Sequence, residues 1–78
     1  MQLDEVPTIR KIVEDNGLEF NAKEGEAHGI VSVQPIPTTR VMVDLLVAIN
    51  SNKPKDYFLN SMVQTQDGIV MTFIHLSY

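Results

Sequence analysis

The sequence has 78 residues, ten acidic and six basic side chains, and a formal net charge of −4 at pH 7. A chain of this length predicts a single domain, residues 1–78, that buries only about 60% of the surface it exposes when unfolded. It contains no cysteine, which excludes disulfides, thiolate metal sites and cysteine nucleophiles.

Residues 4–16 are predicted to form the first helix. Asp4 is a suitable N-cap, and Pro7 is tolerated in a first turn because its missing N–H has no helical partner there. Gly17 stands where a helix commonly ends in a residue with positive φ. Apolar residues recur at the three- to four-residue spacing of one helix face: Val6, Ile9, Ile12 and Val13.

Two strands are predicted next. Residues 18–22 alternate between apolar and polar side chains, which is typical of a strand. Residues 30–34 form the second strand, which Pro35 ends because proline cannot donate a hydrogen bond to a sheet. The polar residues 23–29 between them contain two glycines and are predicted to turn.

Residues 38–50 fit either a helix or a strand. As a helix, the segment is capped by Thr38 or Thr39 and is apolar nearly all round apart from Arg40 and Asp44, which is typical of a central helix or an interface. As a strand, its β-branched residues line one face by alternation. The capping threonines, the polar residues that follow and the length favour the helix.

Residues 57–78 are predicted to form one β-hairpin about Asp67 and Gly68. Asp-Gly between two apolar runs favours a two-residue type I′ turn, in which both central residues have positive φ. That turn pairs Gln66 with Ile69. The pairs that follow from it include Gln64 with Met71 and Met62 with Phe73.

Both faces of this hairpin carry apolar side chains. One face gathers Phe58, Met62, Ile69, Met71 and Phe73. The other gathers Tyr57, Leu59, Val63, Val70, Ile74, Leu76 and Tyr78. A sheet with one solvated face alternates more cleanly. Either helices cover both faces, or a second copy or a partner covers one of them.

The predicted fold class is α+β. The elements are expected in the order helix-hairpin-helix-hairpin (α-β-β-α-β-β), with an antiparallel sheet. The alternative, in which residues 38–50 are a strand, is one helix on a five-stranded antiparallel sheet.

No set of residues indicates an enzyme. His28 and His75 are the only histidines, and their spacing fits no metal site. Glu24 and Glu26 flank a glycine in a predicted turn, where solvated carboxylates are the simplest interpretation. We therefore predict no catalytic residue, no metal site and no cofactor. A separate pair, Lys53 and Lys55, could bind an anion weakly or simply face solvent.

Charge and hydropathy also bear on location and partners. The acidic excess lies in residues 1–39, whereas a protein that binds phosphate backbones needs a basic surface. No run approaches the roughly 18 apolar residues of a membrane span, and no basic segment typical of a secretory signal opens the sequence. We expect a cytoplasmic protein that binds neither nucleic acid nor membrane.

Phe58, Met62, Met71 and Phe73 are the candidate partner-binding residues. The predicted register brings them to one face, and methionine with aromatic residues is favoured at binding surfaces because it is polarizable and adaptable. The same residues would equally serve as the core face beneath the helices. The sequence leaves both interpretations open.

The predicted function is a non-enzymatic protein-interaction module. It would be a small acidic inhibitor or adaptor, comparable in size and charge alone to those that phages or mobile elements encode. It would dock on a larger protein and self-associate as a homodimer or larger homo-oligomer. One alternative is a structural subunit of a homo-oligomeric assembly, in which the hairpin edge extends a neighbour's sheet. Another is a small enzyme or ligand-binding domain whose site lies between protomers.

Overall fold

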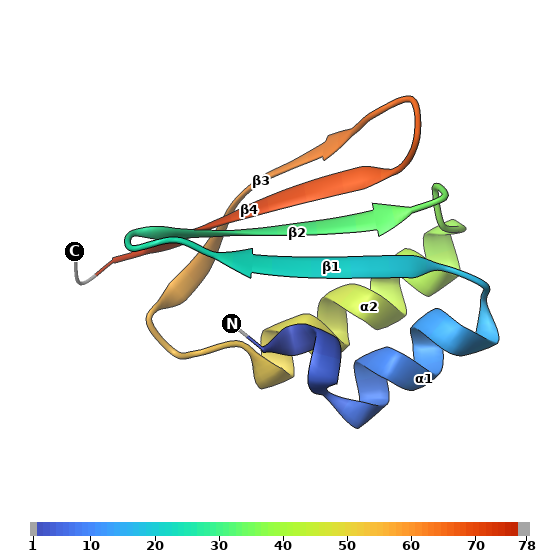
Figure 1. Ribbon diagram of the computed structural model, residues 1–78, viewed down its shortest axis with the longest axis horizontal. Helices are drawn as coiled ribbons and strands as arrows, with labels where there is room; N and C mark the ends of the chain where they lie inside the picture. Colours follow the sequence, from blue (N-terminus) through green and yellow to red (C-terminus); the bar gives the residue numbers. More distant parts are fainter. Residues whose placement is uncertain (1, 77–78) are drawn as a thin grey trace.

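Two α-helices lie on one face of an antiparallel sheet (Figure 1). The computed structural model describes residues 2–76, so Tyr78 of the predicted hairpin lies outside the described residues. Its elements are, in order, η1 (Leu3–Glu5), α1 (Pro7–Asp15), β1 (Glu19–Glu24), β2 (His28–Gln34), α2 (Thr39–Asn52), β3 (Tyr57–Gln64) and β4 (Ile69–His75). The four-stranded sheet has the order β1-β2-β4-β3, so β1 and β3 are its edges in the described part of the chain. The fold class is α+β, as predicted.

The predicted first helix is divided in two. A 3₁₀ turn, η1, precedes α1, and Val6 between them has an extended backbone (φ −69°, ψ 124°). Pro7 explains the break, because a proline ring disfavours helical backbone in the residue before it. Val6 is thus the N-cap and makes no side-chain hydrogen bond. The prediction that Asp4 caps this helix was wrong.

Gly17 follows α1 in the left-handed region, with φ 63°, as predicted. Its N–H donates to the Glu14 carbonyl over 3.3 Å, and the Leu18 N–H donates to the Val13 carbonyl over 2.9 Å. These two bonds form a Schellman motif, which satisfies carbonyls that the helix leaves without partners. The chain therefore turns directly from α1 into β1.

Residues 39–52 form a helix and not a strand. The Thr38 hydroxyl accepts a hydrogen bond from the Val41 N–H over 3.3 Å, as an N-cap side chain does. The buried side chains of α2 are Met42, Leu45, Ala48 and Ile49. Because this segment is helical, the five-stranded alternative does not describe residues 2–76.

The first pair of strands is longer than predicted. The pairing of β1 with β2 reaches Glu24 opposite Gly29, so the turn between them is short. The Gly25 N–H closes this turn by donating to the His28 carbonyl over 2.7 Å. At its other end β2 stops directly before Pro35, as predicted.

The loop between β3 and β4 is longer than a two-residue turn. Gln64 pairs with Ile69, so the register is shifted by two residues from the predicted one. Thr65 closes the loop: its N–H donates to the Gly68 carbonyl over 2.7 Å, and its hydroxyl oxygen accepts from the Gly68 N–H over 3.1 Å. Neither Asp67 nor Gly68 has the positive φ of a type I′ turn. The predicted turn type was wrong.

A β-bulge at Asn60 reverses the faces predicted for the first half of β3. Leu59 pairs with Phe73, whereas Ser61 pairs with the residue before it, so Asn60 is the extra residue. Because side chains alternate along a strand, one extra residue exchanges the two faces beyond it. Tyr57 and Leu59 consequently share the face of Phe73, and Tyr57 is buried there. The prediction had placed both on the opposite face.

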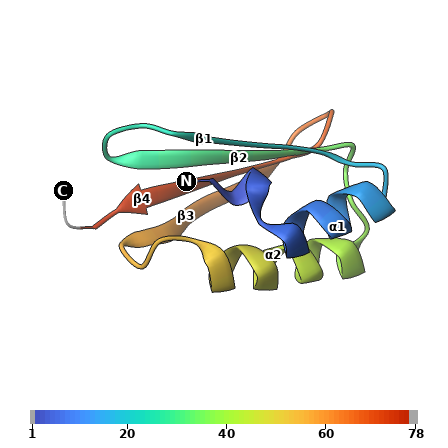
Figure 2. The same cartoon turned by 60° about the horizontal axis from the view of Figure 1, so that its bottom comes forward.

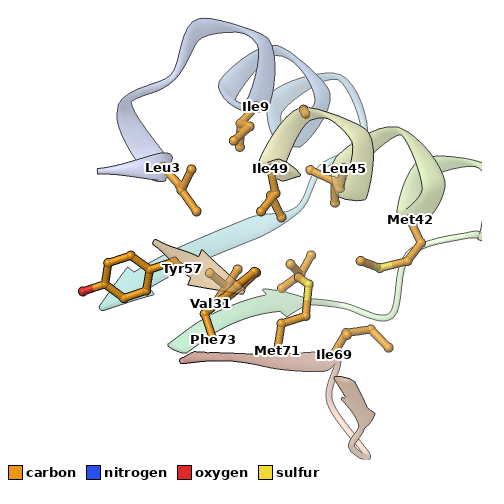
Figure 3. Close-up of a cluster of buried hydrophobic side chains, with 12 residues drawn as sticks. Leu3, Ile9, Val31, Met42, Leu45, Ile49, Tyr57, Ile69, Met71 and Phe73 are labelled. Atoms are coloured by element: carbon orange, nitrogen blue, oxygen red, sulfur yellow. The ribbon is translucent and has the colours of Figure 1, made fainter. Parts of the chain in front are cut away.

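The core lies between the helices and one face of the sheet. Figure 3 shows Leu45 and Ile49 of α2 pointing toward the strands, with Met71 of β4 facing them. The buried apolar side chains of the described residues are Leu3, Ile9, Val31, Val33, Met42, Leu45, Ala48, Ile49, Tyr57, Ile69, Met71 and Phe73. Figure 2 shows both helices on the same side of the sheet. Within residues 2–76, the other face has no helix over it.

We expect Gly68→Ala to destabilise the fold by about 2 kcal/mol or more. The added Cβ would lie 2.0 Å from the Val33 carbonyl oxygen, which is fixed in the sheet. Gly25→Ala is the matched control in the other turn, because its Cβ would meet only the exposed His28 ring, at 2.9 Å, and that ring can rotate away. Urea unfolding of the wild type and both variants measures the difference. A Gly68→Ala protein as stable as the wild type would contradict the close approach of this loop to β2.

Candidate functional site

The four predicted partner-binding residues do not form one exposed surface. Met71 and Phe73 are buried in the core, with exposed fractions of 0% and 2%. Met62 pairs directly with Met71 but is 47% exposed, because it stands on the edge strand. Phe58 is 45% exposed, and the bulge pairs it with Ile74 of the opposite face. Two of the four residues therefore remain at the surface.

β3 is an edge strand without charged residues. Its sequence, YFLNSMVQ, contains no Asp, Glu, Lys, Arg or Pro, whereas the other edge strand, β1, is EFNAKE. Charges and prolines are the usual means by which proteins prevent edge strands from pairing with other chains. The half-exposed apolar side chains of β3 are Phe58, Leu59, Met62 and Val63. The strand thus offers an uncharged backbone edge, interrupted by the bulge at Asn60, together with apolar surface.

An apolar groove lies between α2 and β3 and has a volume of about 370 Å³. Its lining residues are Leu46, Ile49, Asn50, Lys53, Phe58, Leu59 and Phe73. The bulge helps to shape the groove, because it places Leu59 on the helix-covered face, opposite Phe73. The groove adjoins the edge of β3, so one partner could contact both.

Lys53 is the one cation among the residues that line this groove. Its ammonium lies 5.0 Å from the centroid of the Phe58 ring, in a cation–π contact. The ion pairs found within residues 2–76 involve Arg10, Lys11, Arg40 and His75, and none includes Lys53. A half-buried positive charge therefore stands beside apolar surface without a carboxylate partner in the described part of the chain.

The face of the sheet that the helices leave open has an apolar patch toward β3. Strand pairing brings four residues together there, which we call the outer patch: Ile30, Val63, Val70 and Ile74. Val63 pairs with Val70, so the patch is continuous with the exposed part of β3. The charged side chains of this face, Glu19 and Lys23, stand on β1 at the other edge.

Four polar side chains meet at one end of the sheet. The Tyr57 hydroxyl donates to the Glu24 carboxylate over 2.8 Å. The His75 ring contacts Tyr57 edge-on, with 4.9 Å between ring centroids, and its Nε2 lies 3.9 Å from Asp56 Oδ2. These contacts join β3 to the ends of β1 and β4. His28 lies on the opposite face of the sheet from His75, so the two histidines do not share a site.

No three histidine, aspartate or glutamate side chains gather as a metal ion requires, among the residues that the structure describes. The helices of this same part of the chain are too short or too polar to cross a membrane.

Sequence reasoning did not find the groove. Leu46 of α2 lines the groove together with residues of β3 because the helix packs on the sheet, and no spacing along the chain indicates that packing. Leu59 was assigned to the opposite face, because the extra residue at Asn60 leaves no signal in the alternation pattern. Lys53 was considered only as one of two connector lysines. Its position beside an apolar groove becomes visible only in three dimensions.

Comparisons of the chain with protein-family models, with curated proteins and with solved structures give no significant match. The functional interpretation therefore depends on the surfaces around β3.

We expect Met71→Glu and Met62→Glu to differ strongly in stability, although the two methionines are paired in the sheet. An unpaired carboxylate at the fully buried Met71 should cost about 3 kcal/mol or more and leave the chain largely unfolded. Met62→Glu is the matched control and should change the free energy of unfolding by less than about 0.5 kcal/mol, because its carboxylate stays in water. Thermal melts followed by circular dichroism provide the measurement. An equal loss in both variants would show that Met62 belongs to the core.

Proposed function

We propose that the chain is a non-enzymatic protein-interaction module that acts in the cytoplasm, docking through β3 on a larger protein as an inhibitor or adaptor. One observation carries the proposal: an uncharged edge strand presents four half-exposed apolar side chains, in a chain of net charge −4. Contact of such a surface with water is unfavourable, and another protein that covers it removes that contact.

Covering β3 contributes favourable free energy to partner binding. A large apolar side chain contributes about 1.5–3 kcal/mol when it passes from full exposure to full burial. The four on β3 are each about half exposed. Their burial therefore contributes roughly 3–6 kcal/mol in total. Main-chain hydrogen bonds to the strand edge would add to this, as in other complexes formed by strand addition.

A structural subunit of a homo-oligomer is the second candidate, because β3 could pair with its own copy. Two identical antiparallel strands are related by a two-fold axis, so this contact closes as a homodimer. β3 carries no charge that would oppose the pairing, whereas the net negative charge of the chain opposes self-association in general. Sedimentation velocity of the purified chain tests this: a dimer formed without any other protein favours the structural subunit.

We expect Val63→Glu to reduce capture of the partner by about tenfold or more, equivalent to roughly 1.4 kcal/mol of binding free energy. Val63 is 55% exposed, so the free protein tolerates the charge, whereas a covered interface does not. Val47→Glu is the matched control, with the same substitution at a 62% exposed valine of α2. Tagged wild type and both variants are compared by affinity capture from the cells that make the protein, with quantitative mass spectrometry.

Two results would count against this function. Equal capture of one partner by the wild type and by Val63→Glu would remove β3 from the interface. Absence of any captured protein, together with turnover of a small substrate by the purified chain, would indicate an enzyme.

A further inference from the structure

We propose that the groove between α2 and β3 binds an extended segment of the partner protein, in which an apolar side chain fills the groove and a carboxylate pairs with Lys53. This inference rests on the proposed function and specifies the chemistry that the partner must present. It follows from three features of the site: the open strand edge, the shape of the groove and the position of Lys53, which makes no ion pair within residues 2–76.

The open edge of β3 favours an extended segment. β4 occupies one side of β3, and no strand of residues 2–76 lies on the other side. The backbone groups on that side are available for a strand added by a partner. Side chains of an added strand alternate between the two faces of the sheet, so every second one would lie on the helix-covered face, where the groove is.

The groove suits a bulky apolar side chain. Its volume of about 370 Å³ lies within the range of roughly 300–1,000 Å³ that is typical of binding pockets. Leu46 and Ile49 form its helix wall, and Leu59 and Phe73 form its sheet wall. The bulge at Asn60 is what turns Leu59 to this side, so an irregularity of the strand creates the wall.

Lys53 supplies the charge complementarity. Its side chain lines the groove and is held over the Phe58 ring, 5.0 Å from the centroid, so the ammonium is already positioned. It makes no ion pair within residues 2–76. A carboxylate brought there would find a half-buried cation beside a low-dielectric apolar wall, where the attraction is stronger than in water.

For a segment that pairs antiparallel to β3, as neighbouring strands of this sheet do, the position of Lys53 sets the order of the apolar and acidic residues. Lys53 precedes β3 in the chain, so it lies at the amino-terminal end of the strand. In an antiparallel pair, the carboxyl-terminal end of the partner segment lies beside the amino-terminal end of β3. The carboxylate should therefore follow the apolar residue in the partner, as an acidic side chain.

Selection from a random peptide library displayed on phage tests this chemistry without knowledge of the natural partner. We expect the wild type to enrich peptides that have a bulky apolar residue followed by an acidic one. Selection on Lys53→Met should lose the acidic preference and keep the apolar one. Lys55→Met is the matched control, because this lysine stands two residues further along the same connector, is exposed and does not line the groove.

An enriched peptide then allows a double-mutant cycle, measured by fluorescence anisotropy. Replacing its acidic residue by the amide should weaken binding to the wild type, and to Lys55→Met, by roughly threefold to fivefold, the size of a partly exposed ion pair. The same replacement should leave binding to Lys53→Met unchanged, because this variant lacks the ammonium with which the peptide carboxylate pairs. Unfolding curves of the two lysine variants show that the fold is kept.

Three results would overturn the inference. One is a library that yields no binding peptides, and another is an acidic preference that persists in Lys53→Met. The third is a chain that dimerises in sedimentation experiments until Leu59→Glu is introduced, which would assign the groove to a second copy. In the first two cases, loss of partner capture by Val63→Glu would still support the interaction module, so the two proposals can fail separately.

Discussion

β4 is apolar on both of its faces, and two helices can cover only one. Met71 and Phe73 point into the core, whereas Val70 and Ile74 point to the open face. A central strand of this kind is expected in a sheet covered on both sides. With 14 residues in the longer helix and nine in the shorter, the chain has no further element among residues 2–76 to place on the second face. Apolar surface at β3 and on the open face follows from that shortage.

The sequence predicts the elements where local chemistry decides them. Gly17 at the end of α1 and Thr38 at the start of α2 act as expected, because capping depends only on nearby backbone groups. Two of the failures also arise from local chemistry that the sequence analysis did not weigh. Pro7 extends the residue before it and divides the first helix. In the last loop, Thr65 supplies hydrogen bonds that replace the two-residue turn.

The site is less predictable than the fold, because it depends on contacts between distant segments. Alternation correctly placed Met62 with Met71 on one face, since a register shift of two residues preserves the faces. It did not show that β3 is an edge strand and β4 an inner one, so it did not show that Met71 is buried while Met62 stays half exposed. Nor does any local pattern indicate the bulge at Asn60, which decides where Leu59 and Phe58 point.

The arrangement of charge explains how an exposed strand of this kind is compatible with a free protein. Acidic and basic side chains lie on α1, on α2, on the loops and on β1, whereas β3 has none. Repulsion between the net negative charges of two copies opposes their non-specific association. No charged side chain on β3 opposes a strand that approaches its open edge. The net charge therefore restricts which contacts form, and the uncharged edge with Lys53 at one end determines where a matching partner can bind.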